Sequence, residues 1–159
     1  MNTFFGIPAH PLFVHLPVVL IPLASIAVVA MLIRPKWWDQ FKWATLLVAG
    51  VGAFGAIIST GSGEQLEESV EGTASRKLLH AHAEAGESAR TMSVIFFVIL
   101  LTAIVIVPWI KNRRASTPRW LASVVSALLV LSAFAASWTI YDAGHSGAKS
   151  VWSQVKLEK

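Results

Sequence analysis

Four apolar runs dominate the pattern along this chain. They cover residues 12–33, 41–60, 91–110 and 120–141, and only Lys42, near an edge, places a basic residue inside a run. Each run holds about 20 residues or more, which at a rise of ~1.5 Å per residue crosses a hydrocarbon layer of ~30 Å. None shows the alternation of a membrane barrel strand. The pattern therefore predicts an all-α polytopic membrane protein, a four-transmembrane-helix bundle.

The composition supports this fold class. The chain is 55% hydrophobic and only 14% charged, which is unlike a soluble domain. We expect a single domain over residues 1–159, with an outer loop at 61–90 and the lipid bilayer as a partner. The net basic charge follows from membrane topology and needs no nucleic acid to explain it. Because the chain has no cysteine, disulfides, thiolate ligands and covalent c-type haem attachment are excluded.

Basic residues mark the short connections after the first and third runs. The positive-inside rule places such connections in the cytoplasm. Both termini and the 61–90 segment then face outward, and we expect a multi-pass protein of the bacterial inner membrane. The two connections hold one acidic residue, Asp39, and seven basic residues: Arg34, Lys36, Lys42, Lys111, Arg113, Arg114 and Arg119.

All histidines fall at or just beyond the same predicted end of the bundle. Histidine is costly in hydrocarbon and is the commonest side-chain metal ligand. Clustering at one end therefore predicts one site near the bundle mouth, holding a haem or a metal ion. The five are His10, His15, His80, His82 and His145.

His10 and His15 stand at the start of the first span. Pro11 suits the first position of a helix, so His10 would cap the helix and His15 would lie just over one turn inside. Five residues correspond to a rotation of about 140°, so the two side chains need not share a ligand set. Because His15 lies in apolar sequence, we expect it to face the bundle interior; the alternative is a hydrogen-bonded interfacial histidine. Pro17 and Pro22 are expected to bend this helix.

A second histidine motif precedes the third span. A helix beginning near Thr73 or Ser75 would place His80, Glu84 and Glu87 on one face, at positions i, i+4 and i+7, with His82 on another. Glu84 or Glu87 would orient a ligating imidazole or bind a divalent cation directly. The alternative is a solvated polar face.

The last histidine follows the fourth span. Gly144 and Gly147 flank His145, which suggests a tight turn with a close backbone approach. A simple helix end at Gly144 is the alternative.

Together these motifs resemble a bacterial membrane family known as domain of unknown function 2231. His10, His15, His80 and His145 match the family pattern, His82 does not, and Ala148 replaces its second glycine. The resemblance implies a four-helix fold similar to the b-type haem cytochromes, without an assigned reaction. The matching segments are Gly6–Pro17, Thr60-Gly61, Leu79-His80-Ala81, Gly144-His145-Ser146-Gly147 and Val151-Trp152.

The first functional hypothesis is electron transfer by haem b. His15 and His80 are the preferred ligand pair, with His10 and His145 as a second pair or as neighbours of the first. Arg76 and Arg90, with Lys77 and hydroxyls near Thr60, would hold the propionates. A haem near the outer face would exchange electrons with quinol or a periplasmic cytochrome. On a straight helix, however, His80 stands roughly 15 Å above the hydrocarbon, whereas His15 lies slightly within it.

Two other hypotheses stay open. Copper or zinc would bind His10, His15, His80 and His145 with Glu84, because imidazole suits both metals. Alternatively, the chain is a structural subunit of a larger membrane complex. The sequence has no nucleophile–base pair and no phosphate loop, so we expect an electron carrier or a subunit rather than a stand-alone enzyme.

Overall fold

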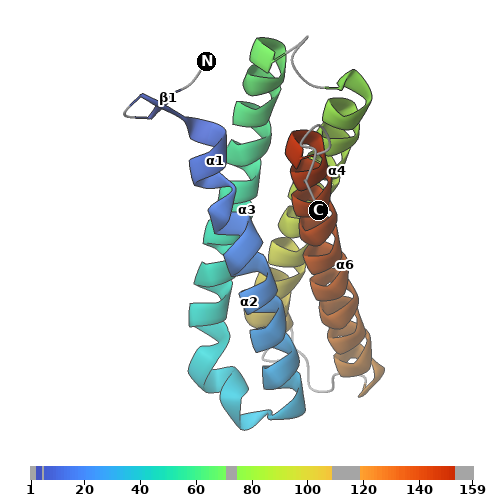
Figure 1. Ribbon diagram of the computed structural model, residues 1–159. Coiled ribbons are helices and arrows are strands. Elements are labelled where there is room, and N and C mark those ends of the chain that lie inside the picture. Colours follow the sequence, from blue (N-terminus) through green and yellow to red (C-terminus); the bar gives the residue numbers. More distant parts are fainter. Residues whose placement is uncertain (1–2, 5, 71–74, 109–118, 153–159) are drawn as a thin grey trace, which may run out of the picture.

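A computed structural model gives the arrangement of the helices (Figure 1) and describes residues 3–4, 6–70, 75–108 and 119–152. The elements in chain order are β1 (Thr3–Phe4), β2 (Ile7–Pro8), α1 (Ala9–Phe13), α2 (His15–Ile33), α3 (Lys36–Val70), α4 (Arg76–Leu101), the π-helix η1 (Thr102–Ile106) and α6 (Arg119–Trp152).

Within the described residues, four helical stretches are long and apolar enough to cross a membrane. They are Ala9–Ile33, Lys36–Gly63, Arg76–Ile106 and Trp120–Trp152. The predicted all-α, four-helix membrane fold is confirmed. One small addition precedes it: β1 and β2 pair antiparallel around Gly6, whose φ of 80° suits glycine.

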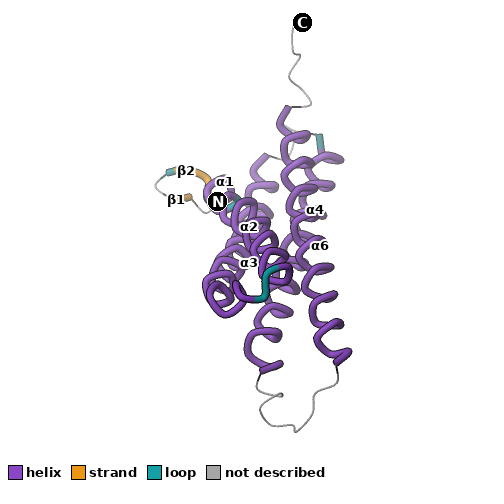
Figure 2. Tube along the Cα trace, turned by 90° about the horizontal axis from the view of Figure 1, so that it is seen from below, coloured by secondary structure: helices purple, strands orange, loops and turns teal. Residues whose placement is uncertain are grey.

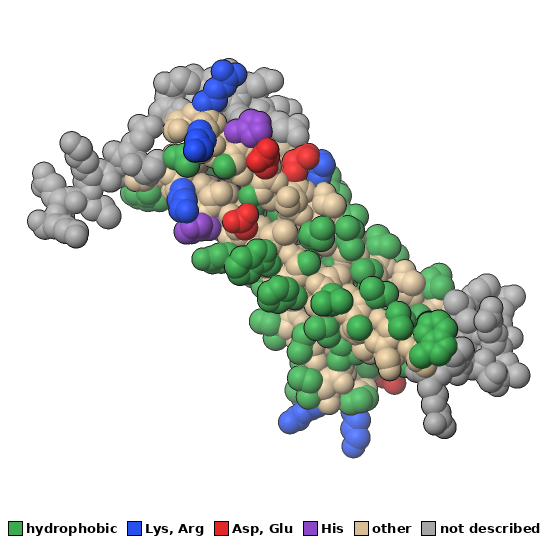
Figure 3. All heavy atoms as spheres, turned by 90° about the vertical axis from the view of Figure 1, so that its right-hand side faces the viewer, with side chains coloured by type: hydrophobic (Ala, Val, Ile, Leu, Met, Phe, Trp, Pro, Cys, Tyr) green, Lys and Arg blue, Asp and Glu red, His purple; other side chains and the backbone are tan. Residues whose placement is uncertain are grey.

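The helices pack in two pairs. α2 lies along α3, and α4 lies along α6, as the view in Figure 2 shows. Large side chains fill the middle of the bundle, among them Ile21, Val28, Phe96, Leu100 and Leu129. Figure 3 shows the resulting surface, a hydrophobic belt between one end with histidine, acidic and basic side chains and another end with basic and acidic side chains but no visible histidine.

A proline divides the first span. Pro17 has no N–H to donate to the carbonyl of Phe13, and α1 ends at Phe13. Helical hydrogen bonds resume at once, since Val18 N–H donates to Val14 O at 3.3 Å. Pro22 is accommodated inside α2. The helix is therefore interrupted just before Pro17, whereas the bend expected at Pro17 and Pro22 stays a prediction.

The described parts of the segment expected as an outer loop, residues 61–70 and 75–90, are almost wholly helical. α3 continues to Val70, and α4 begins at Arg76 directly after Ser75, one of the two predicted starts. Thr73 lies outside the described residues. Both helices thus extend beyond the predicted spans, and they do so at the end where α1 begins and α6 finishes (Figure 1). That end carries all five histidines.

Candidate functional site

Two histidines continue the buried faces of their helices. In α4 the buried positions are Ala85, Ala89, Ser93, Phe96 and Leu100, and one step of three back along this face reaches His82. In α2 the buried positions Ile21 and Pro17 lead back, in the same steps of three or four, through Val14 to His10. His10 and His82 therefore stand where the bundle core ends.

His10 is held by α3. Its Nδ1 lies 2.8 Å from the main-chain oxygen of Ser59. A Cβ built on Gly63, one helical turn further along, would lie 3.1 Å from the same Nδ1. The ring therefore rests against α3 at a position where any larger residue would crowd it.

His82 is held by α6 in the same way. Its Nδ1 lies 3.1 Å from the main-chain oxygen of Ala143 and 3.2 Å from Ser146 Oγ. A Cβ built on Gly147 would lie 2.9 Å from Cε1 of the ring, closer than real Cβ atoms approach. α6 thus needs glycine at this position for the imidazole to fit between the helices.

The two half-buried imidazoles meet between the helices, where the core ends. Their ring centres are 6.0 Å apart and their planes cross at 84°. A carbonyl oxygen can only accept, so Nδ1 of each ring is the donor to its main-chain partner. In a neutral imidazole the lone pair then resides on Nε2. A ring oriented through Nδ1–H by a carbonyl is the usual arrangement of a metal-bound histidine.

His15 does not face the interior, contrary to the expectation from its apolar surroundings. It is exposed, and its Nδ1 lies 2.7 Å from the main-chain oxygen of Pro11 in the preceding turn. The buried face of α2 passes through Pro17 and Ile21, and His15 lies off that face. The bilayer supplies apolar surroundings on the outside as well, so apolar neighbours in sequence do not identify the inner face.

His80 also lies on the outer surface. Its Nδ1 is 3.4 Å from Glu84 Oε1, and the two side chains are 71% and 72% exposed. The predicted i, i+4 contact is thus present, on the solvent-facing side of α4. In the part of the chain that the structure describes, no hydrogen bond or ring contact joins His80 to His15.

His145 forms a flat aromatic stack. Its ring centre lies 5.9 Å from that of Tyr141, with an angle of only 9° between the planes. His145 is exposed and lies beside a cavity between α2 and α6. It is therefore separated by the width of α6 from the side where Ala143 and Gly147 hold His82.

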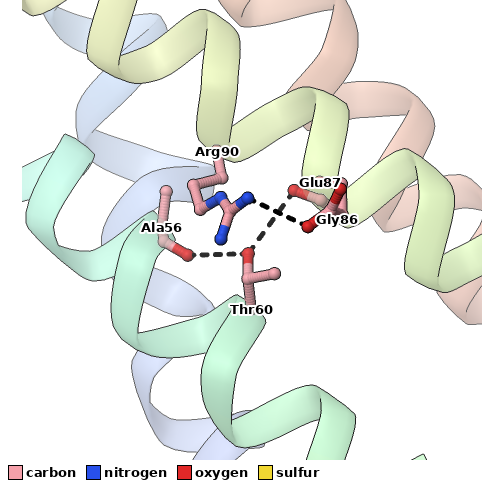
Figure 4. A network of polar contacts seen from close by, with 5 residues as sticks. All are labelled: Ala56, Thr60, Gly86, Glu87 and Arg90. Atoms are coloured by element: carbon pink, nitrogen blue, oxygen red, sulfur yellow. Dashed lines mark hydrogen bonds and ion pairs between the residues drawn. The ribbon is translucent and has the colours of Figure 1, made fainter.

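Arg90, one of the predicted propionate-binding residues, lies between α3 and α4. Figure 4 shows its guanidinium group directed toward Thr60, while Nη2 pairs with Glu87 at 2.9 Å. Thr60 Oγ1 donates to Ala56 O at 3.0 Å and approaches Gly86 O at 3.5 Å. Thr60 follows Ser59, the partner of His10, so this cluster adjoins the imidazole pair. Arg76, the other predicted residue, is the exposed first residue of α4.

Among the described residues, no three histidine or acidic side chains gather as a metal-ligand set. The expected combination of four histidines with Glu84 is not assembled there.

A family comparison covers nearly the whole chain. Residues 6–156 match the family model of predicted membrane proteins named DUF2231. The chain belongs to this family. No curated protein and no solved structure matches it. Membership supports a multi-pass membrane protein and leaves the chemistry to be argued from the site.

In this DUF2231 chain, His82, which is not part of the sequence motifs, is one of the two histidines that pair at the end of the core. His82 lies outside the family pattern as we matched it, yet it meets His10. The signal that identifies it is the run of small residues Ala85, Ala89 and Ser93, which continues its face of α4. Small residues mark helix–helix contacts in membranes, where large apolar residues also face lipid.

Proposed function

We propose that this protein is a b-type cytochrome in which His10 and His82 would hold the iron of one haem. The observation that carries the proposal is the interior imidazole pair. Each ring is anchored through Nδ1 by a main-chain carbonyl of a neighbouring helix, at 2.8 and 3.1 Å. This role replaces His15 and His80, the pair favoured by the sequence motifs, because those two side chains are exposed.

The spacing of the rings suits one shared metal centre. A metal–imidazole bond is ~2.0–2.1 Å long, so each ring centre would lie about 3 Å from the ion. Two rings on opposite sides of one ion would then be about 6 Å apart. The observed separation between ring centres is 6.0 Å.

The number of ligands favours haem over copper or zinc. Protein sites for zinc take three or four side-chain ligands. A porphyrin supplies four nitrogens, so two imidazoles complete the coordination of its iron. The described residues bring together two such side chains rather than three.

Other groups near the pair are suited to a polar cofactor. Ser59 Oγ is buried and has no hydrogen-bond partner among the described residues. Such an orphaned hydroxyl is unfavourable by about 1–3 kcal/mol, unless a bound group provides the partner. Arg90, directed toward Thr60 (Figure 4) and eight residues along α4 from His82, supplies a positive charge that suits a propionate.

The residues have separable roles in this proposal. His10 and His82 would bind the iron through Nε2, and the carbonyls of Ser59 and Ala143, which hold the rings at Nδ1, would increase their basicity. Haem iron supplies reversible one-electron chemistry. The positive-inside distribution supports an orientation in which this end of the bundle lies at the outer face of the bacterial inner membrane. A quinol or a periplasmic cytochrome is the proposed redox partner, with or without a larger membrane complex.

Absorption spectroscopy tests the proposal. The full chain is purified in mild detergent from haem-sufficient cells, and oxidised and dithionite-reduced spectra are recorded. We expect a Soret band and sharp reduced α and β bands, lost in His10→Ala and His82→Ala. His80→Ala is the matched control on the same helix as His82 and leaves the spectrum unchanged.

Folding is controlled separately. Free imidazole is added to the variant His82→Gly, in which it can occupy the space of the missing side chain. Recovery of a low-spin spectrum would show that this variant is folded and lacks only the ligand. Folded wild-type protein without a Soret band would contradict the proposal. Loss of the spectrum in His15→Ala and His80→Ala, with His10→Ala and His82→Ala unaffected, would return the ligand role to the exposed histidines.

A further inference from the structure

A second site lies on the opposite side of α6. A cavity of about 400 Å³ separates this helix from α2. Val18 and Pro22 form the α2 wall, and Ser137, Ile140 and Gly144 lie on the α6 wall. The parallel rings of Tyr141 and His145 complete the lining. The volume is in the usual range for a small-molecule site, ~300–1,000 Å³.

The cavity has a polar end and an apolar end. His145 lies toward the histidine end of the bundle, and Ser137 lies eight residues deeper, about 12 Å along the helix. Between them the walls are mainly apolar, and the hydroxyl of Ser137 is already engaged with Ser25 at 3.0 Å. The ring nitrogens of His145 have no hydrogen-bond partner in the described part of the chain.

The charge of the lining restricts the ligand. Among the residues that the structure describes, no lysine, arginine or acidic residue lines the cavity. A phosphate headgroup would lack a cation within it, whereas an uncharged polar ring would match its neutral walls. The flat Tyr141–His145 stack offers an aromatic surface for such a ring, and the imidazole can hydrogen-bond a carbonyl or hydroxyl on it.

We propose that this cavity binds the head ring of a lipid-soluble quinone, with one ring oxygen hydrogen-bonded to His145 and the apolar tail directed along α2 and α6 into the bilayer. A quinone combines an uncharged polar ring with a long hydrocarbon chain. These two parts match the polar end of the cavity at His145 and the mainly apolar walls below it. This binding does not depend on haem at the His10–His82 pair. The two sites use different faces of the same turns of α6, since Ala143 and Gly147 contact His82 while Gly144 and His145 line the cavity.

Gly144 allows the cavity to be filled without disturbing the protein. A Cβ built there meets no atom within 4 Å, so Gly144→Leu would place its side chain in the cavity. Gly61 on α3 is equally open and exposed, and Gly61→Leu is the matched control. His145→Phe keeps a ring stacked on Tyr141 and removes only the hydrogen-bonding nitrogens.

The experiment uses a photoreactive azido-benzoquinone with a ten-carbon tail, added to the full chain in lipid nanodiscs. Cross-linked peptides are mapped by mass spectrometry, with an unlabelled benzoquinone of the same tail as competitor. We expect competed labelling on the segments containing Val18–Pro22 and Ser137–His145. Labelling falls by about tenfold or more in Gly144→Leu, because the added side chain overpacks the occupied cavity. It falls roughly threefold to tenfold in His145→Phe, the loss expected for one hydrogen bond, and stays unchanged in Gly61→Leu.

Three outcomes would overturn the proposal. Labelling that Gly144→Leu leaves unchanged would show that the quinone binds elsewhere. Labelling that the unlabelled quinone does not displace would show partition into lipid only. Labelling displaced by a phospholipid as effectively as by the quinone would identify the cavity as a lipid site. Each is read from nanodisc-bound folded protein whether or not haem is present, so failure here is distinct from failure of the cytochrome proposal.

Discussion

The interior histidines and the exposed histidines occupy the same end of one bundle but have different surroundings. His10 and His82 are fixed by main-chain carbonyls from other helices and face each other at 6.0 Å. Among the described residues, the polar partners of His15 and His80 are Pro11 and Glu84, each from the same local segment. The difference is a matter of helical rotation, since His80 and His82 are two residues apart. The position of a histidine along the sequence therefore predicts at which end of the bundle it lies. The rotation of its helix decides whether the side chain faces the core or the surface.

The largest expected effect distinguishes the two faces of α6. Gly147→Val forces a side chain into the ring of His82, which must give up its contacts with Ala143 and Ser146. We expect destabilisation by about 1–3 kcal/mol. Gly144→Val, three residues away on the open face, should leave the melting temperature in detergent equal or higher. Equal melting temperatures for the two variants would argue against the interior placement of His82.

A smaller effect is expected at the partner ring. Gly63→Ala brings a methyl group to 3.1 Å from Nδ1 of His10, a distance that a slight ring shift can relieve. We expect a loss of about 0.5–1 kcal/mol relative to Gly61→Ala, which meets open space. Thermal unfolding of both variants in the same detergent provides the comparison. A Gly63→Ala protein more stable than Gly61→Ala would show that His10 does not rest on α3.

The smallest effect concerns the exposed pair. Glu84→Gln removes the charge near His80, where both side chains are more than two-thirds exposed. Solvent-exposed ion pairs contribute little, and we expect a change below about 0.5 kcal/mol. The reduced absorption spectrum should also be unchanged. A shift in the α band of Glu84→Gln would indicate that His80 takes part in the site.

The four-helix architecture could be predicted from the sequence because the length of an apolar span is readable without knowing how the helices rotate. The four spans, the helix start at Ser75 and the interruption before Pro17 all follow from local rules. The orientation of His15 could not be predicted in this way, because apolar residues of a membrane helix face both the lipid and the core. The hydrophobic pattern then carries little information about rotation.

Small residues carry the missing information. Ala85, Ala89 and Ser93 define the inner face of α4, and Gly63 and Gly147 mark where the imidazoles need space. These glycines have no chemistry of their own, so a search for ligand residues passes over them. Their contacts depend on pairing α1 with α3 and α4 with α6, which the sequence leaves undetermined.

The most direct test of the central claim is the dithionite-reduced spectrum of two variants, His82→Ala and His80→Ala. The two substituted positions are two residues apart on α4 and lie on different faces of that helix. The account predicts sharp α and β bands in the wild-type protein and in His80→Ala, and their loss in His82→Ala. The bands should also appear in a separate variant, His82→Gly, when free imidazole is added. Bands that persist in folded His82→Ala, or their absence from folded wild-type protein, would contradict it.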